Sequence, residues 1–505
     1  MARRKYPRPL AIDLFRPLAR DGAALLNDQL AERIETLVAR GRLKGGDYLP
    51  PLRLLARKLD VSVGTVARAY EAIRRRGLAM PQSTRGMRVS RPDDRPFPAG
   101  GPAWASLVSQ PIVPAAPLDA DIPRVQGASV ARFDISEPGP ELMPAALLQR
   151  AFARALGDVQ ELRYAPLTGS VAATRAVERY LRGRGVALDD SSLFLTSGTT
   201  QSLAVITRAL LPAGGVVLTE HPTWHVALSV FGSAGARVVA LPVDDDGLQV
   251  RTLADAVLRH NPAFLYIQPA FQNPTGISLS AERRAEIVAL AHKLHLVVVE
   301  DDFASELAFD APPPPLRTAA GGDVVIHLKS FAKLLAPALR VGVIVAPAQF
   351  GPVLRGAKHG LDPFVSALSQ RVLADCLADP GFEPHVRRLA AELHQRWQVL
   401  AAALARRMPA DVRWTTPRGG FCAWLRLPRG TDATPFIREA VKRGVGLVPG
   451  DLFCIDESAS GALRLAFGAT GPDEIERGVA VLADVLGAQD RVQRFVQHVP
   501  HAVAP

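Results

Sequence analysis

The chain has 505 residues, which is too long for one small domain and predicts two or three folding units. Hydrophobic residues make up 48% and charged residues 22%, a globular composition that excludes a disordered or fibrous chain. The formal net charge is +11, and its excess lies entirely in residues 1–90, which hold 19 basic and 8 acidic side chains. A basic head joined to a body with equal numbers of basic and acidic residues predicts that the head binds a polyanion. A solvated basic tail is the alternative.

Cysteine content and hydropathy indicate the cellular compartment in which the protein is expected. Cys376, Cys422 and Cys454 are too few and too scattered for a disulfide framework or a zinc site, so we expect ordinary packing residues and no metal. The sequence contains no run of 18 or more apolar residues, and its first residues lack the apolar stretch of a signal peptide. We therefore expect a cytoplasmic protein that does not contact the membrane.

The basic head is predicted to contain three helices. Apolar residues recur at helical spacing over residues 25–38, and Pro50-Pro51 opens a second helix over residues 52–59. Ser62 is placed to cap a third helix that ends at Gly77. Two helices separated by the tight turn at residues 60–61 predict a helix-turn-helix.

A short hairpin follows the third helix. Residues 78–90 read as two strands with a tip around residues 82–86, because Pro81 and Gly86 punctuate them. Arg85 and Arg88 are expected to project from this hairpin. The order of elements predicts a winged helix-turn-helix.

Three segments of the head carry a family resemblance: LPPLRLLA at residues 49–56, VSVGTVARAY at 61–70 and RGL at 76–78. They resemble the winged helix-turn-helix of the GntR family of bacterial regulators. The resemblance implies double-stranded DNA as a partner, with the third helix entering the major groove by its first residues. Many relatives place Arg or Asn after the serine, where this chain has Val63 and Gly64, which leaves fewer side chains for bidentate contacts to bases. The implied contacts are Arg53, Ser62, Gly64, Thr65, Arg68 and Arg85.

The chain beyond the head divides into three further parts. Residues 91–130 are predicted to be a proline-rich linker, since prolines recur there without a helix or strand period. Residues 131–485 are predicted to form the body, and residues 486–505 a C-terminal tail.

The body alternates short apolar strands with helical stretches. This alternation predicts a mainly parallel α/β sheet, whose ligands bind at the carboxyl ends of the strands. The predicted strands are residues 193–196, 216–219, 238–241, 264–268, 296–300 and 324–328.

Polar residues follow several of these strands. Ser197-Gly198-Thr199 opens a helix and offers backbone N–H groups to a phosphate. Asn273-Pro274-Thr275-Gly276, Asp301-Asp302 and Ser330-Phe331-Ala332-Lys333 follow three other strands. Taken singly, such residues are ordinary turns, caps and surface side chains, but their combination and order favour one ligand site.

This combination resembles the fold type I aminotransferases, which bind pyridoxal 5′-phosphate (PLP), and it implies a smaller C-terminal α/β subdomain. The resemblance implies that Lys333 holds PLP as an internal aldimine and that Asp301 pairs with the pyridinium nitrogen. It also implies that Asn273 hydrogen-bonds the phenolic oxygen and that Trp224 stacks on the ring. Relatives usually add a tyrosine two or three residues after the aspartate, where this chain has Phe303 and Ala304.

The resemblance also implies the residues at the two ends of the site. Arg464 matches the arginine that holds the substrate carboxylate. The phosphate would be held by Gly198, Thr199, Ser330 and Arg340, together with Tyr164 from the partner subunit of a homodimer.

A GntR-type head joined to an aminotransferase-like body is the arrangement of the MocR subfamily, which this chain resembles over nearly its full length. The resemblance implies a regulator whose body binds PLP through Lys333 and senses an amine, an amino acid or the cofactor itself. A working aminotransferase with an appended DNA-binding head is the alternative. A third hypothesis is a head that binds protein rather than DNA.

Overall fold

The fold is described from a computed structural model, in which two compact units span Met1–Pro111 and Ile112–Pro505. We call them the head and the body and describe each by itself. None of the described helices is both long and apolar enough to cross a membrane. The described residues are 12–15, 18, 25–39, 42–75, 78–82, 86–90, 125, 129–159, 163–318, 321–428, 431, 433–456, 458–459 and 461–498.

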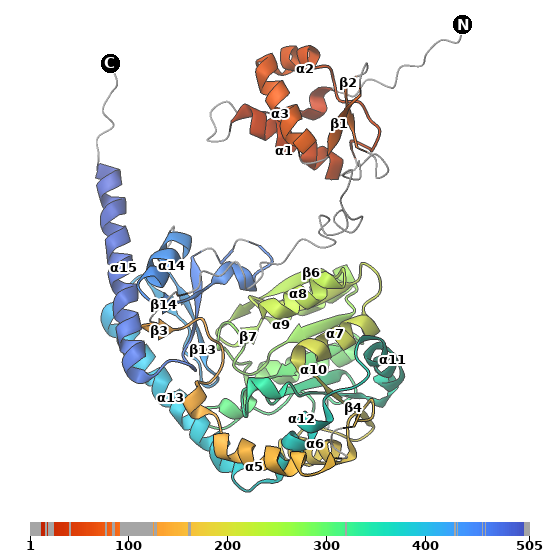
Figure 1. The fold of residues 1–505 in the computed structure, drawn as a ribbon, viewed down its shortest axis with the longest axis vertical. Helices are drawn as coiled ribbons and strands as arrows, with labels where there is room; N and C mark the ends of the chain where they lie inside the picture. Colours follow the sequence, from red (N-terminus) through yellow and green to blue (C-terminus); the bar gives the residue numbers. More distant parts are fainter. Residues whose placement is uncertain are drawn as a thin grey trace. The chain divides into compact units, whose positions relative to one another are not determined.

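The head contains the three predicted helices, α1 (Leu26–Ala39), α2 (Leu52–Leu59) and α3 (Val63–Arg75) (Figure 1). Asp60 ends α2 in the left-handed conformation, with φ of 54°, and makes the tight turn. Apolar side chains from all three helices bury one another in a small core, and a 3-10 helix, η1 (Ile12–Phe15), adds Phe15. The predicted helix-turn-helix is therefore confirmed.

The predicted hairpin is also present, as β1 (Ala79–Gln82) paired antiparallel with β2 (Gly86–Val89). Arg85 lies outside the described residues. The expectation that Arg88 projects from the hairpin is wrong, because its side chain is only 6% exposed and Nη2 lies 3.7 Å from Sδ of Met80. Successive residues of a strand point to opposite faces, and Arg88 and the core residue Val89 are both buried, so the end of β2 is covered on both faces.

The body is built on a mixed eight-stranded sheet with the strand order β4-β11-β10-β9-β8-β5-β6-β7 (Figure 1). All six predicted strands are present, and β10, β9, β8, β5 and β6 run parallel to one another. β11 was not predicted and lies antiparallel between β4 and β10. The strands are β4 (Ser191–Thr196), β5 (Val216–His221), β6 (Arg237–Asp244), β7 (Gly247–Leu248), β8 (Phe264–Ile267), β9 (Val298–Asp302), β10 (Val325–Ser330) and β11 (Gly342–Pro347).

Helices connect the parallel strands of this sheet, because parallel neighbours need a crossover connection. Their apolar faces bury the central strands, of which β8 to β11 are buried over their whole length. The helices are α5 (Ala145–Leu156), α6 (Val171–Gly183), α7 (Thr199–Leu210), α8 (His225–Ser233), α9 (Val250–His260), α10 (Ala281–Lys293), α11 (Gly351–Leu361) and α12 (Ala367–Ala378).

A smaller subdomain follows the long helix α13 (Phe382–Arg407). Its antiparallel sheet has the order β12-β13-β16-β15, and β14 (Val445–Gly446) pairs with β3 (Ala131–Arg132) from the start of the body. This is the predicted C-terminal subdomain. Its other elements are β12 (Arg413–Trp414), β13 (Cys422–Arg426), α14 (Ala433–Lys442), β15 (Val448–Pro449), η9 (Gly450–Phe453), β16 (Ala462–Ala466) and α15 (Pro472–His498).

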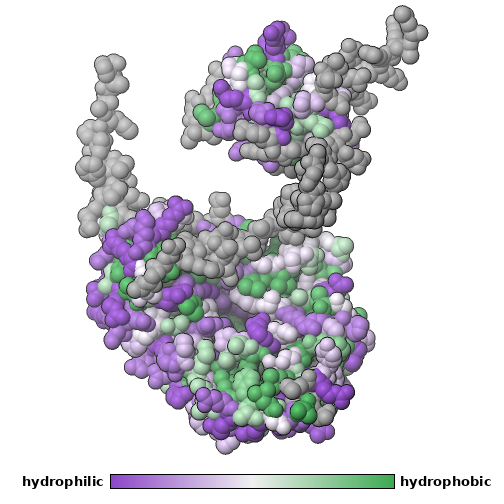
Figure 2. All heavy atoms as spheres, viewed as in Figure 1, coloured by the Kyte–Doolittle hydropathy of each residue, from purple (hydrophilic) through white to green (hydrophobic). Residues whose placement is uncertain are grey.

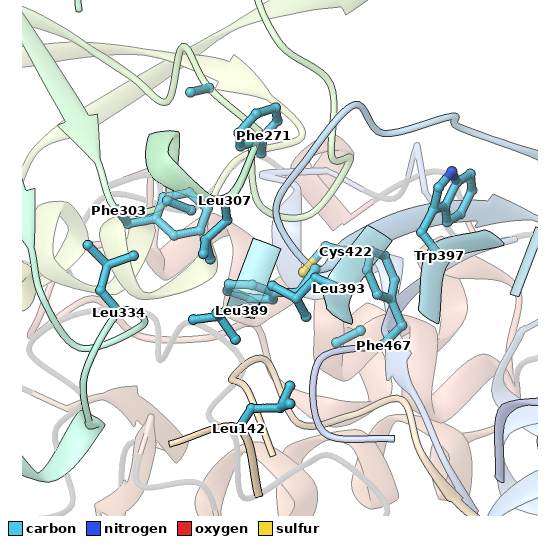
Figure 3. Close-up of a cluster of buried hydrophobic side chains, with 14 of the residues drawn as sticks. Leu142, Phe271, Phe303, Leu307, Leu334, Leu389, Leu393, Trp397, Cys422 and Phe467 are labelled. Carbon is cyan, nitrogen blue, oxygen red and sulfur yellow. The ribbon is translucent and has the colours of Figure 1, made fainter. Parts of the chain in front are cut away.

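One hydrophobic core joins the large and small parts of the body (Figure 3). Phe271 and Phe303, which follow β8 and β9, lie in the same cluster as Leu389 of α13 and Phe467 after β16. This shared core fixes the ends of the central strands against the small subdomain. In the view of Figure 2, hydrophilic and hydrophobic residues are interspersed on the face of each unit.

Candidate functional site

A cavity of about 390 Å³ lies at the carboxyl ends of the central strands, where the polar residues were predicted to gather. Residues from the large part of the body line it together with Phe421, Val448 and Arg464 of the small subdomain. Eight of the predicted site residues line this one cavity: Thr199, Trp224, Asn273, Asp301, Ser330, Lys333, Arg340 and Arg464.

Asp301 is fully buried near the end of β9, and its two carboxylate oxygens have different surroundings. Oδ2 accepts hydrogen bonds from the hydroxyl of Tyr266 at 2.7 Å and from Nε2 of Gln268 at 3.0 Å. Oδ1 is buried and has no hydrogen-bond partner among the described residues. Burial raises the pKa of this carboxyl to about 6, although the two hydrogen bonds favour the charged form. Asp301 therefore holds one oxygen ready for a donor that enters the cavity.

Gln268 connects Asp301 to Asn273 and was not predicted. Its Oε1 accepts a 3.0 Å hydrogen bond from the backbone N–H of Asn273, while its Nε2 donates to Asp301. Its own backbone N–H donates to the buried Glu220 at 2.9 Å. The only signal in the sequence was a polar side chain between an apolar strand and Pro269.

Lys333 follows β10 and reaches the cavity beside the small subdomain. Its Nζ lies 5.8 Å from the centroid of the Phe421 ring. Burial lowers the pKa of this ammonium group, and the guanidinium groups of Arg464 and Arg340 act in the same direction. Nζ is therefore uncharged in a larger share of molecules than a surface lysine would be.

One end of the cavity is suited to an anion. Thr199 begins α7, and the preceding Gly198 has a φ of 98°. A Cβ atom on Gly198 would lie only 3.0 Å from Nη2 of Arg340, so glycine allows this arginine to approach the start of the helix. Nη2 of Arg340 also donates to the carbonyl of Ser197 at 3.1 Å. Helix N–H groups, a helix dipole and a guanidinium group thus converge there.

The small subdomain contributes Arg464 to the cavity, on β16, where the side chain is 4% exposed. Its Nη2 donates to the carbonyl of Asp134 at 2.8 Å, and its Nη1 lies 3.4 Å from Oδ1 of Asn273. Arg132 and Asp134, which also line the cavity, form an ion pair with both N···O distances at 2.8 Å. This pair was not predicted.

Trp224 and Tyr164 differ in their placement. Trp224 lines the cavity just before α8, and the neighbouring Thr223 N–H donates to the carbonyl of Phe453 in the small subdomain. Tyr164 does not line the cavity of its own chain: it is 84% exposed, and its ring lies 4.7 Å from that of Phe364. Its expected role concerns the cavity of a partner subunit and stays a prediction.

The positions that usually carry a tyrosine are filled by apolar packing. Phe303 is 9% exposed and meets Phe421 edge-on, with ring centroids 6.1 Å apart. Ala304 is fully buried. These two residues contribute core contacts and no hydroxyl to the cavity.

A buried charged cluster around Lys329 was also missed. Nζ of Lys329 lies 2.6 Å from Oε2 of Glu306 and 3.1 Å from Oδ2 of Asp302. Burial alone would raise the pKa of Asp302, but Lys329 and His327 lower it to about 2. The sequence signal was a lysine inside an apolar strand. Burying a lysine costs free energy unless its charge is paired.

All three cysteines are free thiols. Cys376 and Cys422 are buried in the main core, as expected of packing residues. Sγ of Cys454 lies within 4.8 Å of a ring nitrogen of His221 and a carboxylate oxygen of Asp456, and atoms of these three kinds can bind a metal ion. The Ser458 hydroxyl lies 2.8 Å from Nε2 of His221 and is its hydrogen-bond partner there.

The predicted DNA-contact residues lie around the start of α3. Arg53 on α2 and Ser62, Gly64 and Arg68 on or beside α3 are exposed. Thr65 is only 9% exposed, so its side chain faces the head rather than solvent.

Comparison with known proteins shows what this combination of units represents. Residues 26–89 match the family model described as bacterial regulatory proteins of the gntR family, and residues 138–482 match aminotransferase class I and II. The chain is also 30% identical over 449 residues to the probable rhizopine catabolism regulatory protein MocR of Rhizobium meliloti, covering 86% of this chain and 88% of that protein. The chain belongs to the MocR group of GntR-family transcriptional regulators.

Two further relatives bear on the two units of this MocR-type chain. The uncharacterized HTH-type transcriptional regulator YisV of Bacillus subtilis is 28% identical over 466 residues, covering 91% of this chain and 95% of the relative. The crystal structure of LysN, an α-aminoadipate aminotransferase from Thermus thermophilus complexed with N-(5′-phosphopyridoxyl)-L-leucine, matches 73% of this chain and 97% of its own with a TM-score of 0.67 and 30% identity. The MocR-type body therefore has an aminotransferase fold, in a family that typically binds PLP.

Proposed function

We propose that this MocR-type regulator is a homodimer that binds PLP through Lys333 and changes its affinity for DNA when an amine or amino acid binds in the same cavity. Oδ1 of Asp301, which has no hydrogen-bond partner in the described part of the chain, carries this proposal. A buried carboxylate oxygen without a donor is costly, and the protonated ring nitrogen of PLP is a donor of the required kind.

The cavity residues fit the remaining groups of PLP. The phosphate fits the start of α7, where Gly198 leaves room for Arg340. Lys333 offers an amine whose pKa is lowered by burial, and the uncharged amine is the form that bonds to a carbonyl carbon. Bound there, PLP would supply an aldehyde that amines attack and a ring that accepts electrons.

The same cavity has groups that suit an amino acid effector. Arg464 is a buried guanidinium whose planar fork can bind a carboxylate bidentately. The amine of the effector would then compete with Lys333 for the cofactor. Such a ligand shifts the regulator between states only by its differential affinity for them, so the proposal requires a measurable coupling to DNA binding.

The cofactor part of the proposal is tested by absorbance. Wild-type protein reconstituted with PLP should show a band near the visible edge, and Lys333→Ala should lack it. Lys293→Ala, which removes an exposed lysine at the end of α10, is the matched control and should keep the band. A colourless wild-type protein after reconstitution would contradict the proposal.

A working aminotransferase is a second candidate, favoured by the presence of Asn273, Asp301, Lys333 and Arg464 in one cavity. Continuous turnover of an amino donor with a keto acid would support it. A single half-reaction without cycling would favour the sensor, and the missing hydroxyl at Phe303 and Ala304 is a physical reason to expect weak catalysis.

A further inference from the structure

The first turn of α3 uses its hydroxyl groups internally. Oγ of Ser62 accepts a 3.0 Å hydrogen bond from the N–H of Thr65 and lies 2.9 Å from the Thr65 hydroxyl. This is a helix cap, and Thr65 is buried at 9% exposure. The two hydroxyls therefore interact with each other and with the backbone at the start of the helix.

Val63, by contrast, is the first residue of α3 and is 45% exposed. The next turn of the helix supplies the apolar contacts to the head core through Val66, which is fully buried. An apolar side chain at the start of this helix is thus presented to the outside.

Gly64 follows Val63, and the fold of the head does not require a glycine there. Its φ is not positive, and among the described residues an added Cβ would meet nothing closer than Oγ of Ser62 at 3.6 Å, an ordinary contact. Glycine weakens a helix relative to alanine, so a glycine at this position does not stabilise the fold of the head. A benefit arises if another surface approaches the backbone closely.

We propose that Val63 and Gly64 read thymine in the major groove: the Val63 side chain packs on thymine 5-methyl groups, and Gly64 lets the helix start approach the base edges. This inference rests on DNA binding by the head and specifies its sequence chemistry. In the major groove the 5-methyl group distinguishes thymine, and apolar side chains are the groups that contact it.

Charged side chains on α2 and α3 favour DNA as the molecule that binds at the start of α3. Arg53 and Arg68 are both exposed and have no ion-pair or hydrogen-bond partner within the described part of the chain. α2, which carries Arg53, packs against α3, which carries Arg68. Guanidinium groups placed there suit phosphate contacts, which set the position of the helix while bases are read by its first turn.

The test begins with DNA duplexes selected from a random library by the full-length protein. Each thymine of the selected duplex is then replaced by uracil, which removes only the 5-methyl group. Wild-type protein should lose about fourfold in affinity at one or more positions, the equivalent of about 0.8 kcal/mol for one buried methyl-sized group. Val63→Ala should bind the thymine and uracil duplexes equally. Val353→Ala, which truncates a 48% exposed valine on α11 of the body, is the matched control and should behave as wild type.

Gly64→Ala supplies an independent arm. The variant should have a thermal midpoint equal to or above that of wild type, because alanine favours the helix, yet should bind the selected duplex at least tenfold more weakly. Equal wild-type affinities for thymine and uracil duplexes at every position, or unchanged binding by Gly64→Ala, would overturn the inference. Failure to enrich any duplex would instead overturn DNA binding itself, and the reading of thymine with it.

Discussion

The hydroxyl of Tyr266 donates a 2.7 Å hydrogen bond to Oδ2 of Asp301 in the interior of the body. Tyr266 is fully buried on β8, the strand next to the one that carries Asp301. Together with Gln268 it saturates Oδ2 and leaves Oδ1 as the oxygen available to a ligand. The electrostatics of the cavity are therefore set by side chains that do not line it as well as by those that do.

Tyr266→Phe should weaken PLP binding without preventing folding. Loss of this hydrogen bond removes support for the charged carboxylate, so the pKa of Asp301 should rise further above about 6. We expect a loss of about 1–2 kcal/mol in cofactor binding, or roughly fivefold to thirtyfold in Kd. Fluorescence titration with PLP measures it, and an unchanged Kd in a folded variant would show that Asp301 does not contact the cofactor.

Gly198→Ala tests the anion end of the cavity. The added Cβ would lie 3.0 Å from Nη2 of Arg340, so the variant should bind PLP more weakly while its affinity for pyridoxal, which lacks the phosphate, changes less. Gly214→Ala is the matched control: Gly214 also has a positive φ, of 68°, but a Cβ there would meet no atom of the described residues within 4 Å. Both variants carry the backbone penalty, about 1 kcal/mol, and only Gly198→Ala should lose selectivity for the phosphate. Equal losses for PLP and pyridoxal would contradict this assignment.

Much of the fold could be predicted because local patterns determine it. The bounds of α2 agree residue for residue with its amphipathic pattern, which Pro51 opens and Asp60 closes in the left-handed conformation. The predicted parallel strands are apolar runs that end in polar residues. β11 was not predicted, since a short apolar run carries no information about its direction or its neighbours.

Only those site residues that stand in sequence motifs could be predicted. Lys333, Asp301 and Asn273 stand in recognisable strings, and the fold brings them to one cavity. Gln268 and Tyr266 gain their importance only from contacts across neighbouring strands, which no local pattern contains. Arg88 was misjudged for the same reason: the end of β2 is covered on both faces, and the local pattern does not contain the contacts that cover it.

The stability of the body should depend on pH through Glu220. Burial raises the pKa of this carboxyl from 4.5 to about 8, so the folded protein keeps its proton at pH values where the unfolded chain has lost it. Stability should therefore fall as pH rises from about 4.5 to 8, by up to about 4 kcal/mol from this group. Glu220→Gln should remove that part of the fall. Thermal midpoints of both proteins at pH 5 and pH 8 measure it, and identical pH dependence would refute it.

Lys329→Met should destabilise the body strongly. It leaves the buried carboxylates of Asp302 and Glu306 without their shared cation, which typically costs about 3–5 kcal/mol. The loss should be larger at pH 8 than at pH 5, since unpaired buried carboxylates are tolerated better once they take up protons. Lys293→Met, at the exposed end of α10, should leave the thermal midpoint nearly unchanged at both pH values. A small, pH-independent loss in Lys329→Met would show that the cluster is not a stabilising unit.

The most direct test of the sensor proposal is the DNA affinity of the PLP-loaded protein with and without a panel of amines and amino acids. Fluorescence anisotropy on a selected duplex, at fixed salt, measures this coupling. At least one compound should change the Kd of wild type by about fivefold or more, the lower range of allosteric coupling, and the same compound should have no effect on Lys333→Ala. A wild-type Kd that is indifferent to PLP and to every compound, with the duplex still bound, would contradict the proposal.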